Sequence, residues 1–162
     1  MTRIIAGEAR GRTIKVPAEG TRPTADRARE GLFSSLTARW GFAGSSVLDL
    51  FAGSGALGLE AASRGTEEAV LVESSADAVK IIRHNMGVVK HPGVRVQEMK
   101  VGTYLASAPR RHFDLVLADP PYAFDEVDEL IAAIEPVLTD RAMVVIERHV
   151  DSADTEWPVG FE

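Results

Sequence analysis

Residues 47–58 read VLDLFAGSGALG, a β-prone apolar run that leads through a glycine-rich loop into a predicted helix. Gly53, Gly55 and Gly58 have the G-x-G-x-x-G spacing of cofactor-binding loops. Glycine is needed there because the backbone must turn tightly and let a ligand approach where a Cβ would collide. The free N–H groups at the start of the following helix point toward such a ligand. The segment therefore predicts a cofactor loop, with a purely structural turn as the alternative.

The run at 47–51 is the first of five β-prone runs, and the other four occupy residues 69–72, 94–96, 115–118 and 143–146. Helices are predicted between these runs, near residues 56–63, 76–88 and 127–137. Nearly continuous apolar strands that alternate with helices are typical of a parallel sheet covered on both faces. The sequence therefore predicts an α/β protein with an open, doubly wound, mostly parallel sheet.

Residues 1–44 are predicted to form a basic extension, a short hairpin followed by a helix, ahead of a catalytic domain at 45–162. Two β-prone runs, at 4–5 and 13–16, suit the hairpin, and Thr24 can cap a helix that runs to Trp40. Residues 1–30 carry seven basic and four acidic side chains, whereas the other 132 carry eleven and twenty. This split favours an anionic partner for the extension, with a solvated basic loop as the alternative.

The composition excludes several classes of protein. A chain of 162 residues with 45% hydrophobic residues suits one globular domain, and the absence of cysteine excludes thiol chemistry and disulfides. No stretch approaches the roughly 20 apolar residues of a membrane span, so we expect a cytoplasmic protein. We also expect a monomer. The four histidines have no i, i+4 pairing, so no metal site is predicted.

Two carboxylates bear on the identity of the cofactor. Glu73 ends the second β-prone run twenty residues after Gly53, where a carboxylate can accept hydrogen bonds from both hydroxyls of a ribose. Asp49 would lie close to the pyrophosphate of a dinucleotide and repel it. S-adenosylmethionine has no phosphate and carries an ammonium and a sulfonium, which a carboxylate favours. Asp49 therefore favours S-adenosylmethionine, although an aspartate that only caps loop amides is the simpler alternative.

A second motif, Asp119-Pro120-Pro121-Tyr122, follows the fourth β-prone run at the edge of the sheet where ligands bind. The two prolines end the strand and restrict the backbone. The Asp119 carboxylate and the Pro120 carbonyl oxygen can then accept both N–H groups of an exocyclic amine. Tyr122 offers a flat face for a base taken out of its stack. Ordinary turn chemistry is the alternative.

With both motifs, the sequence resembles the RsmD family of Rossmann-like, S-adenosylmethionine-dependent methyltransferases, which methylate N2 of a guanine in 16S ribosomal RNA. The resemblance rests on residues 3–7, 10–12, 22–24, 29–30, 49–58, 64–65 and 119–122. It implies a Rossmann-like methyltransferase fold and a 16S ribosomal RNA substrate, either free or in a small ribosomal subunit. The sequence departs from the family at its end, where we expect the family's last hairpin, beyond Trp157, to be missing.

The resemblance implies roles for three sets of residues. Those that bind S-adenosylmethionine would be Asp49, Phe51, Gly53, Gly55, Glu73, Arg22 and Thr24. Those that hold the target base would be Asp119, Pro120 and Tyr122. Those that contact RNA would be Arg3, Arg10, Arg12 and Lys15. Residues 98–101 would lie near the adenine, and the residue that contacts it is left open.

Three alternatives stay open on the sequence alone. An NAD-dependent oxidoreductase could use the same glycine loop. A methyltransferase could act on another exocyclic base amine, such as adenine N6 in RNA or DNA, because all these amines are conjugated with their rings. A non-catalytic RNA-binding module could keep the fold without the reaction.

Overall fold

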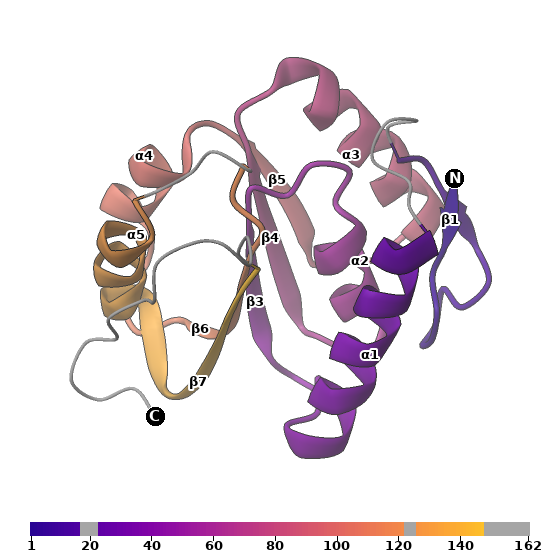
Figure 1. The fold of residues 1–162 in the computed structure, drawn as a ribbon, viewed down its shortest axis with the longest axis horizontal. Helices are drawn as coiled ribbons and strands as arrows, with labels where there is room; N and C mark the ends of the chain where they lie inside the picture. Colours follow the sequence, from indigo (N-terminus) through magenta and orange to yellow (C-terminus); the bar gives the residue numbers. More distant parts are fainter. Residues whose placement is uncertain (17–22, 122–125, 148–162) are drawn as a thin grey trace.

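The computed structural model describes residues 1–16, 23–121 and 126–147, with the backbone alone for residues 23–26. Its main sheet is parallel, in the order β5-β4-β3-β6-β7 (Figure 1). The strands are β3 (Ser46–Leu50), β4 (Glu68–Glu73), β5 (Val94–Glu98), β6 (Phe113–Ala118) and β7 (Leu138–Ile146). Because the strand order reverses between β3 and β6, the loops after these two strands lie at a switch point, where ligands bind in open α/β sheets.

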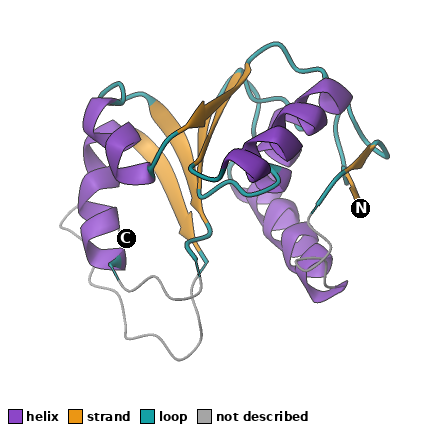
Figure 2. Ribbon diagram, turned by 90° about the horizontal axis from the view of Figure 1, so that it is seen from above, coloured by secondary structure: helices purple, strands orange, loops and turns teal. Residues whose placement is uncertain are grey.

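Helices cover both faces of the sheet, as Figure 2 shows from above. One face carries α1 (Pro23–Arg39), α2 (Ala56–Ser63) and α3 (Ala76–Val89). The other carries α4 (Val101–Ser107), α5 (Val127–Ile134) and the 3-10 turn η2 (Glu135–Val137). Successive strand residues point to opposite faces, so Val47 joins the first core and Leu48 the second. The predicted open, doubly wound α/β fold is confirmed.

The N-terminal extension is built into the first core. Its hairpin consists of β1 (Thr2–Arg3) and β2 (Thr13–Ile14), which pair antiparallel. Ile4 and Ile14 are buried in the same cluster as Phe33 of α1 and Leu59 of α2. The boundary predicted at residue 44 stays a prediction, but the apolar side chains of the extension share a core with the sheet.

Several elements differ from their predicted extents. Helix α1 begins at Pro23, which suits the first helical position, so Thr24 lies inside the helix and not at its cap. Helix α4 is absent from the prediction, and β7 begins at Leu138, five residues before the run predicted for it. The predicted absence of a last hairpin concerns positions beyond residue 147, outside the described residues. None of the described helices has the length and apolar character needed to span a membrane.

Candidate active site

The glycine loop lies between β3 and α2, and two of its glycines have left-handed backbone conformations. Gly53 has φ +60° and Gly55 has φ +82°, conformations that favour glycine. A Cβ at Gly55 would lie 2.8 Å from Leu71 Cδ2, so a side chain here would also force Leu71 of β4 to shift. A Cβ at Gly53 would meet no atom within 4 Å. Gly53 therefore faces open space, as a loop that admits a ligand must.

Asp49 is buried at the carboxyl end of β3, with 1% of its surface exposed. Its Oδ2 accepts a hydrogen bond from the Gly58 N–H at 2.9 Å, so the capping interpretation holds for this oxygen. Its Oδ1 is buried and has no hydrogen-bond partner among the described residues. Burial raises the pKa of Asp49 to about 7, and the carboxylates of Asp119 and Glu73 contribute further. One oxygen is thus left for a donor from outside the described residues.

Glu73 ends β4 and holds the glycine loop in place. Its Oε1 accepts a hydrogen bond from the Gly53 N–H and its Oε2 accepts one from the Ser75 N–H, both at 2.8 Å. Each carboxylate oxygen can accept a second hydrogen bond. The ribose contact predicted for Glu73 stays a prediction, and the carboxylate lies where it could also reach a ligand over the loop.

A cavity of about 490 Å³ opens beside Glu73, within the usual size range of small-molecule sites. Its walls come from the ends of β3 and β4, the loop after β5, and helices α4 and α5. The residues include Phe51, Glu73, Lys100, Val101, Leu105 and Leu130. The loop at 98–101 thus contributes Lys100 to this cavity. The contributions of Leu105 and Leu130 were missed, although the amphipathic pattern of 127–137 could have indicated that one face of that helix is buried.

Asp119 follows β6 on the same edge of the sheet, and its side chain reaches solvent. Partial burial, followed by the neighbouring Glu147 carboxylate, raises the pKa of Asp119 to about 6. Glu147 follows β7, where its N–H donates to the Ala118 carbonyl at 2.9 Å, so the two carboxylates end adjacent parallel strands. Glu147 was missed by sequence reasoning, although it ends the fifth β-prone run just as Asp119 ends the fourth.

Some predicted site residues are not brought into view. Arg22 and Tyr122 lie outside the described residues, and only the backbone of Thr24 is described. Pro120 lies beside Asp119 and is partly exposed. The roles of these residues therefore stay predictions.

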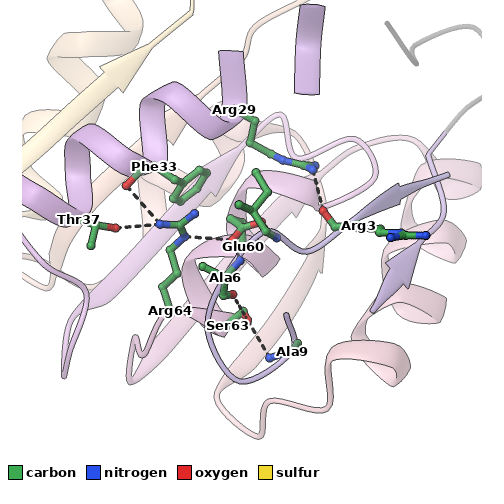
Figure 3. Close-up of polar contacts among 10 residues, drawn as sticks. Arg3, Ala6, Ala9, Arg29, Phe33, Thr37, Glu60, Ser63 and Arg64 are labelled. Atoms are coloured by element: carbon green, nitrogen blue, oxygen red, sulfur yellow. Dashed lines mark hydrogen bonds and ion pairs between the residues drawn. The ribbon is translucent and has the colours of Figure 1, made fainter. Parts of the chain in front are cut away.

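The four predicted RNA contacts lie in the extension and have exposed side chains. Arg12 has a structural task as well, since its Nη1 donates to the carbonyls of Val88 and Val89, at 3.2 and 3.1 Å. These carbonyls end α3, where a cation is favourable. The side chain of Arg3 points away from the cluster of polar contacts around Glu60, Ser63 and Arg64 (Figure 3).

That polar cluster fastens the extension to α2. Glu60 is fully buried, and its carboxylate accepts hydrogen bonds from the N–H groups of Ile5 and Ala6, at 2.8 and 3.1 Å. Arg64 donates to the same carboxylate at 3.0 Å and also contacts α1, as Figure 3 shows. Ser63 donates to the Ala6 carbonyl and accepts from the Ala9 N–H.

Comparison with known proteins gives consistent matches over nearly the whole chain. Residues 2–162 match the family described as conserved hypothetical protein 95. The chain is 37% identical over 153 residues to ribosomal RNA small subunit methyltransferase D of Escherichia coli K12, covering 93% of this chain and 76% of that protein. The protein of the same name from Haemophilus influenzae is 33% identical over 155 residues, covering 92% and 79%. The solved structure of yhhF from Escherichia coli has a TM-score of 0.85 at 34% identity, over 98% of this chain and 86% of that one.

Proposed function

The chain belongs to the RsmD family, and from this premise we propose that it transfers a methyl group from S-adenosylmethionine to N2 of a guanine in 16S ribosomal RNA. The observation that carries the proposal is the buried Asp49, which accepts from the Gly58 N–H, keeps one oxygen without a described partner, and lies one strand away from Asp119. The curated relatives named as small-subunit ribosomal RNA methyltransferases support the substrate. We further propose that the enzyme acts in the cytoplasm, where such a substrate is found, and that it is a monomer.

The residues fit S-adenosylmethionine better than a dinucleotide. Asp49 Oδ1 is a buried acceptor that an ammonium group would satisfy, whereas a phosphate there would be repelled. Glu73 would accept from ribose hydroxyls, and the apolar side chains of Phe51, Val101 and Leu105 in the cavity beside it would receive an adenine. When bound, the cofactor supplies an electrophilic methyl group on its sulfonium.

The chain's own residues would orient the amine and remove a proton. The Asp119 carboxylate and the Pro120 carbonyl oxygen hold the two N–H groups, which directs the nitrogen lone pair and increases its electron density. After transfer, the nitrogen carries one hydrogen too many. Because the pKa of Asp119 is raised to about 6, its carboxylate can accept that proton at neutral pH and release it to water.

The Glu147 carboxylate supports guanine as the substrate. In guanine the N2 amine is adjacent to N1–H, so its edge presents donors that suit two neighbouring acceptors. In adenine and cytosine, the amine is adjacent to a ring nitrogen that accepts hydrogen bonds and would face a carboxylate unfavourably. The pair formed by Asp119 and Glu147 at the ends of β6 and β7 therefore favours guanine N2 over adenine N6.

The test is methyl transfer from tritiated S-adenosylmethionine to 16S ribosomal RNA and to small subunits from a strain that lacks the enzyme. Digestion to nucleosides and mass spectrometry should identify N2-methylguanosine. Asp119→Ala should abolish transfer and still bind S-adenosylhomocysteine, whereas Asp77→Ala on the exposed surface of α3 should act normally. Formation of N6-methyladenosine, or binding of NAD with no binding of S-adenosylhomocysteine, would contradict the proposal.

A further inference from the structure

Asn85 of α3 is fully buried and connects two segments that are far apart in the sequence. Its Nδ2 donates to the Lys15 carbonyl at 2.8 Å and to the Ser54 carbonyl at 2.9 Å. Its Oδ1 accepts from the Lys15 N–H at 2.8 Å. One side-chain amide thus binds the end of the N-terminal hairpin and the middle of the glycine loop.

The three contacts fix both the position and the chemistry of this side chain. Both N–H groups donate and the oxygen accepts, so the orientation of the amide follows from its partners. All three partners are backbone groups, which cannot rotate away as side chains do. An aspartate of the same shape could accept from Lys15 but could not donate to either carbonyl, so the site requires an amide.

The glycine loop depends on such support. Gly53 and Gly55 flank Ser54 in left-handed conformations, and glycine restricts the backbone less than any other residue. Glu73 holds the loop from β4 through the Gly53 N–H, and Asn85 holds it from α3 through the Ser54 carbonyl. Without Asn85, only one side of the loop would be held by a side chain among these contacts.

We propose that Asn85 is a positioning residue that couples docking of the basic hairpin to the cofactor-binding conformation of the glycine loop. The same amide satisfies Lys15 and Ser54, so displacement of one segment disturbs the side chain that holds the other. RNA bound to the hairpin then strengthens cofactor binding, and by reciprocity bound cofactor strengthens RNA binding. This inference rests on the proposed function.

Ser63 offers a matched control because it also fastens the extension but does not touch the loop. Its hydroxyl binds Ala6 and Ala9 and lies on α2, away from Ser54. Asn85→Ala and Ser63→Ala each remove buried hydrogen bonds to the extension. Only the first removes a hydrogen bond to the glycine loop.

The experiment compares these variants by calorimetry with S-adenosylhomocysteine and by hydrogen exchange of the Gly53, Ser54 and Gly55 amides. Asn85→Ala should weaken binding about tenfold, raise the KM for S-adenosylmethionine more than it lowers kcat, and speed exchange in the loop. Ser63→Ala should leave all three within twofold. A fragment of 16S ribosomal RNA should tighten S-adenosylhomocysteine binding at least threefold in the wild type and not in Asn85→Ala.

Unchanged loop exchange in Asn85→Ala, or an equal effect of Ser63→Ala, would overturn the inference. Should Asn85→Ala fail to fold, Asn85→Ser keeps a polar group and is read by the same two measurements. Loop exchange needs no ligand, so it separates this inference from the proposed function. A wild type that binds no S-adenosylhomocysteine would refute the proposed function, whatever the exchange shows.

Discussion

Replacing Asp49 by asparagine should stabilise the protein at alkaline pH and weaken its cofactor binding. Burial raises the pKa of Asp49 from 3.8 to about 7, and each unit corresponds to about 1.4 kcal/mol. The ionised carboxylate therefore costs the folded state up to about 4 kcal/mol above pH 7. Asparagine keeps an acceptor for the Gly58 N–H but leaves an amide group without a partner, which costs about 1–3 kcal/mol. The net gain at pH 8 should be about 1–3 kcal/mol.

The pH dependence is the sharper part of this prediction. A carboxyl group whose pKa is raised on folding stabilises the protein most below its unfolded pKa, and this contribution is lost as pH rises from about 4 to about 7. Between pH 5 and pH 8, Asp49 should lower the stability of the wild type by about 2–3 kcal/mol. Asp49→Asn lacks this loss, so the difference in stability between the two proteins should change by that amount.

Urea unfolding at pH 5 and pH 8 measures both quantities, and Glu67→Gln controls for removal of an exposed negative charge. Calorimetry on the same samples should show S-adenosylhomocysteine binding at least about tenfold weaker in Asp49→Asn, roughly 1.4 kcal/mol. A stability difference that is equal at the two pH values would refute the assignment of a raised pKa to Asp49. Unchanged affinity would refute its contact with the ligand's ammonium group.

Three other predictions follow from the contacts of the extension and the site. Gly7→Ala should lower the free energy of unfolding in urea by well over 2 kcal/mol, because its Cβ would lie 1.8 Å from a backbone oxygen of α2. Gly11→Ala, also at positive φ but in open space, should lower it by only about 1–2 kcal/mol. Equal losses in the two variants would contradict the close packing at Gly7. The rate of methyl transfer should rise with pH through about 6 as the Asp119 carboxyl ionises, and a profile flat from pH 5 to pH 7 would exclude its ionised form from the reaction. Arg10→Ala should lower the salt dependence of RNA binding by about one counterion without loss of stability. Arg12→Ala should have the same effect on RNA binding and should also lower the stability by about 1 kcal/mol, because it loses its hydrogen bonds to the end of α3. An unchanged salt slope in Arg10→Ala would show that Arg10 lies outside the RNA interface.

The fold could be predicted from the sequence because its central strands are apolar and its loops carry strong signals. The run before Gly53 is buried on both faces of the sheet, and no helix pattern competes with it. Helix α4 could not be found in this way, since its seven residues include Gly102 and Thr103, which have low helix propensity. The start of β7 could not be predicted because Asp140 and Arg141 are charged and exposed there, and because the pairing of β7 with β6 is irregular.

The site could be predicted only where its chemistry is local. Asp49, Gly53 and Gly58 belong to one motif, and the N–H groups of the two glycines donate to Glu73 and Asp49 respectively. Glu60 and Asn85 give no such signal, because their partners in the extension lie 54 to 70 positions away and meet them only when the extension folds back. Arg12 has a role that the sequence did not indicate: besides its predicted RNA contact, its guanidinium donates to the carbonyls at the end of α3.

Glu60 and Asp49 are both buried carboxylates, and the partners of each, more than its burial, indicate whether it is structural or belongs to the binding site. Glu60 has both oxygens engaged by backbone donors and the guanidinium of Arg64 beside it, so the protein itself compensates its charge. Asp49 has one donor, one unpartnered oxygen, and two other carboxylates, Asp119 and Glu73, that add to its burial in raising its pKa. Within the described residues nothing of opposite sign offsets it. An ionised carboxylate that destabilises the folded state in this way is best explained by a positively charged ligand that pairs with it. The ammonium group at the methionine end of S-adenosylmethionine is such a ligand.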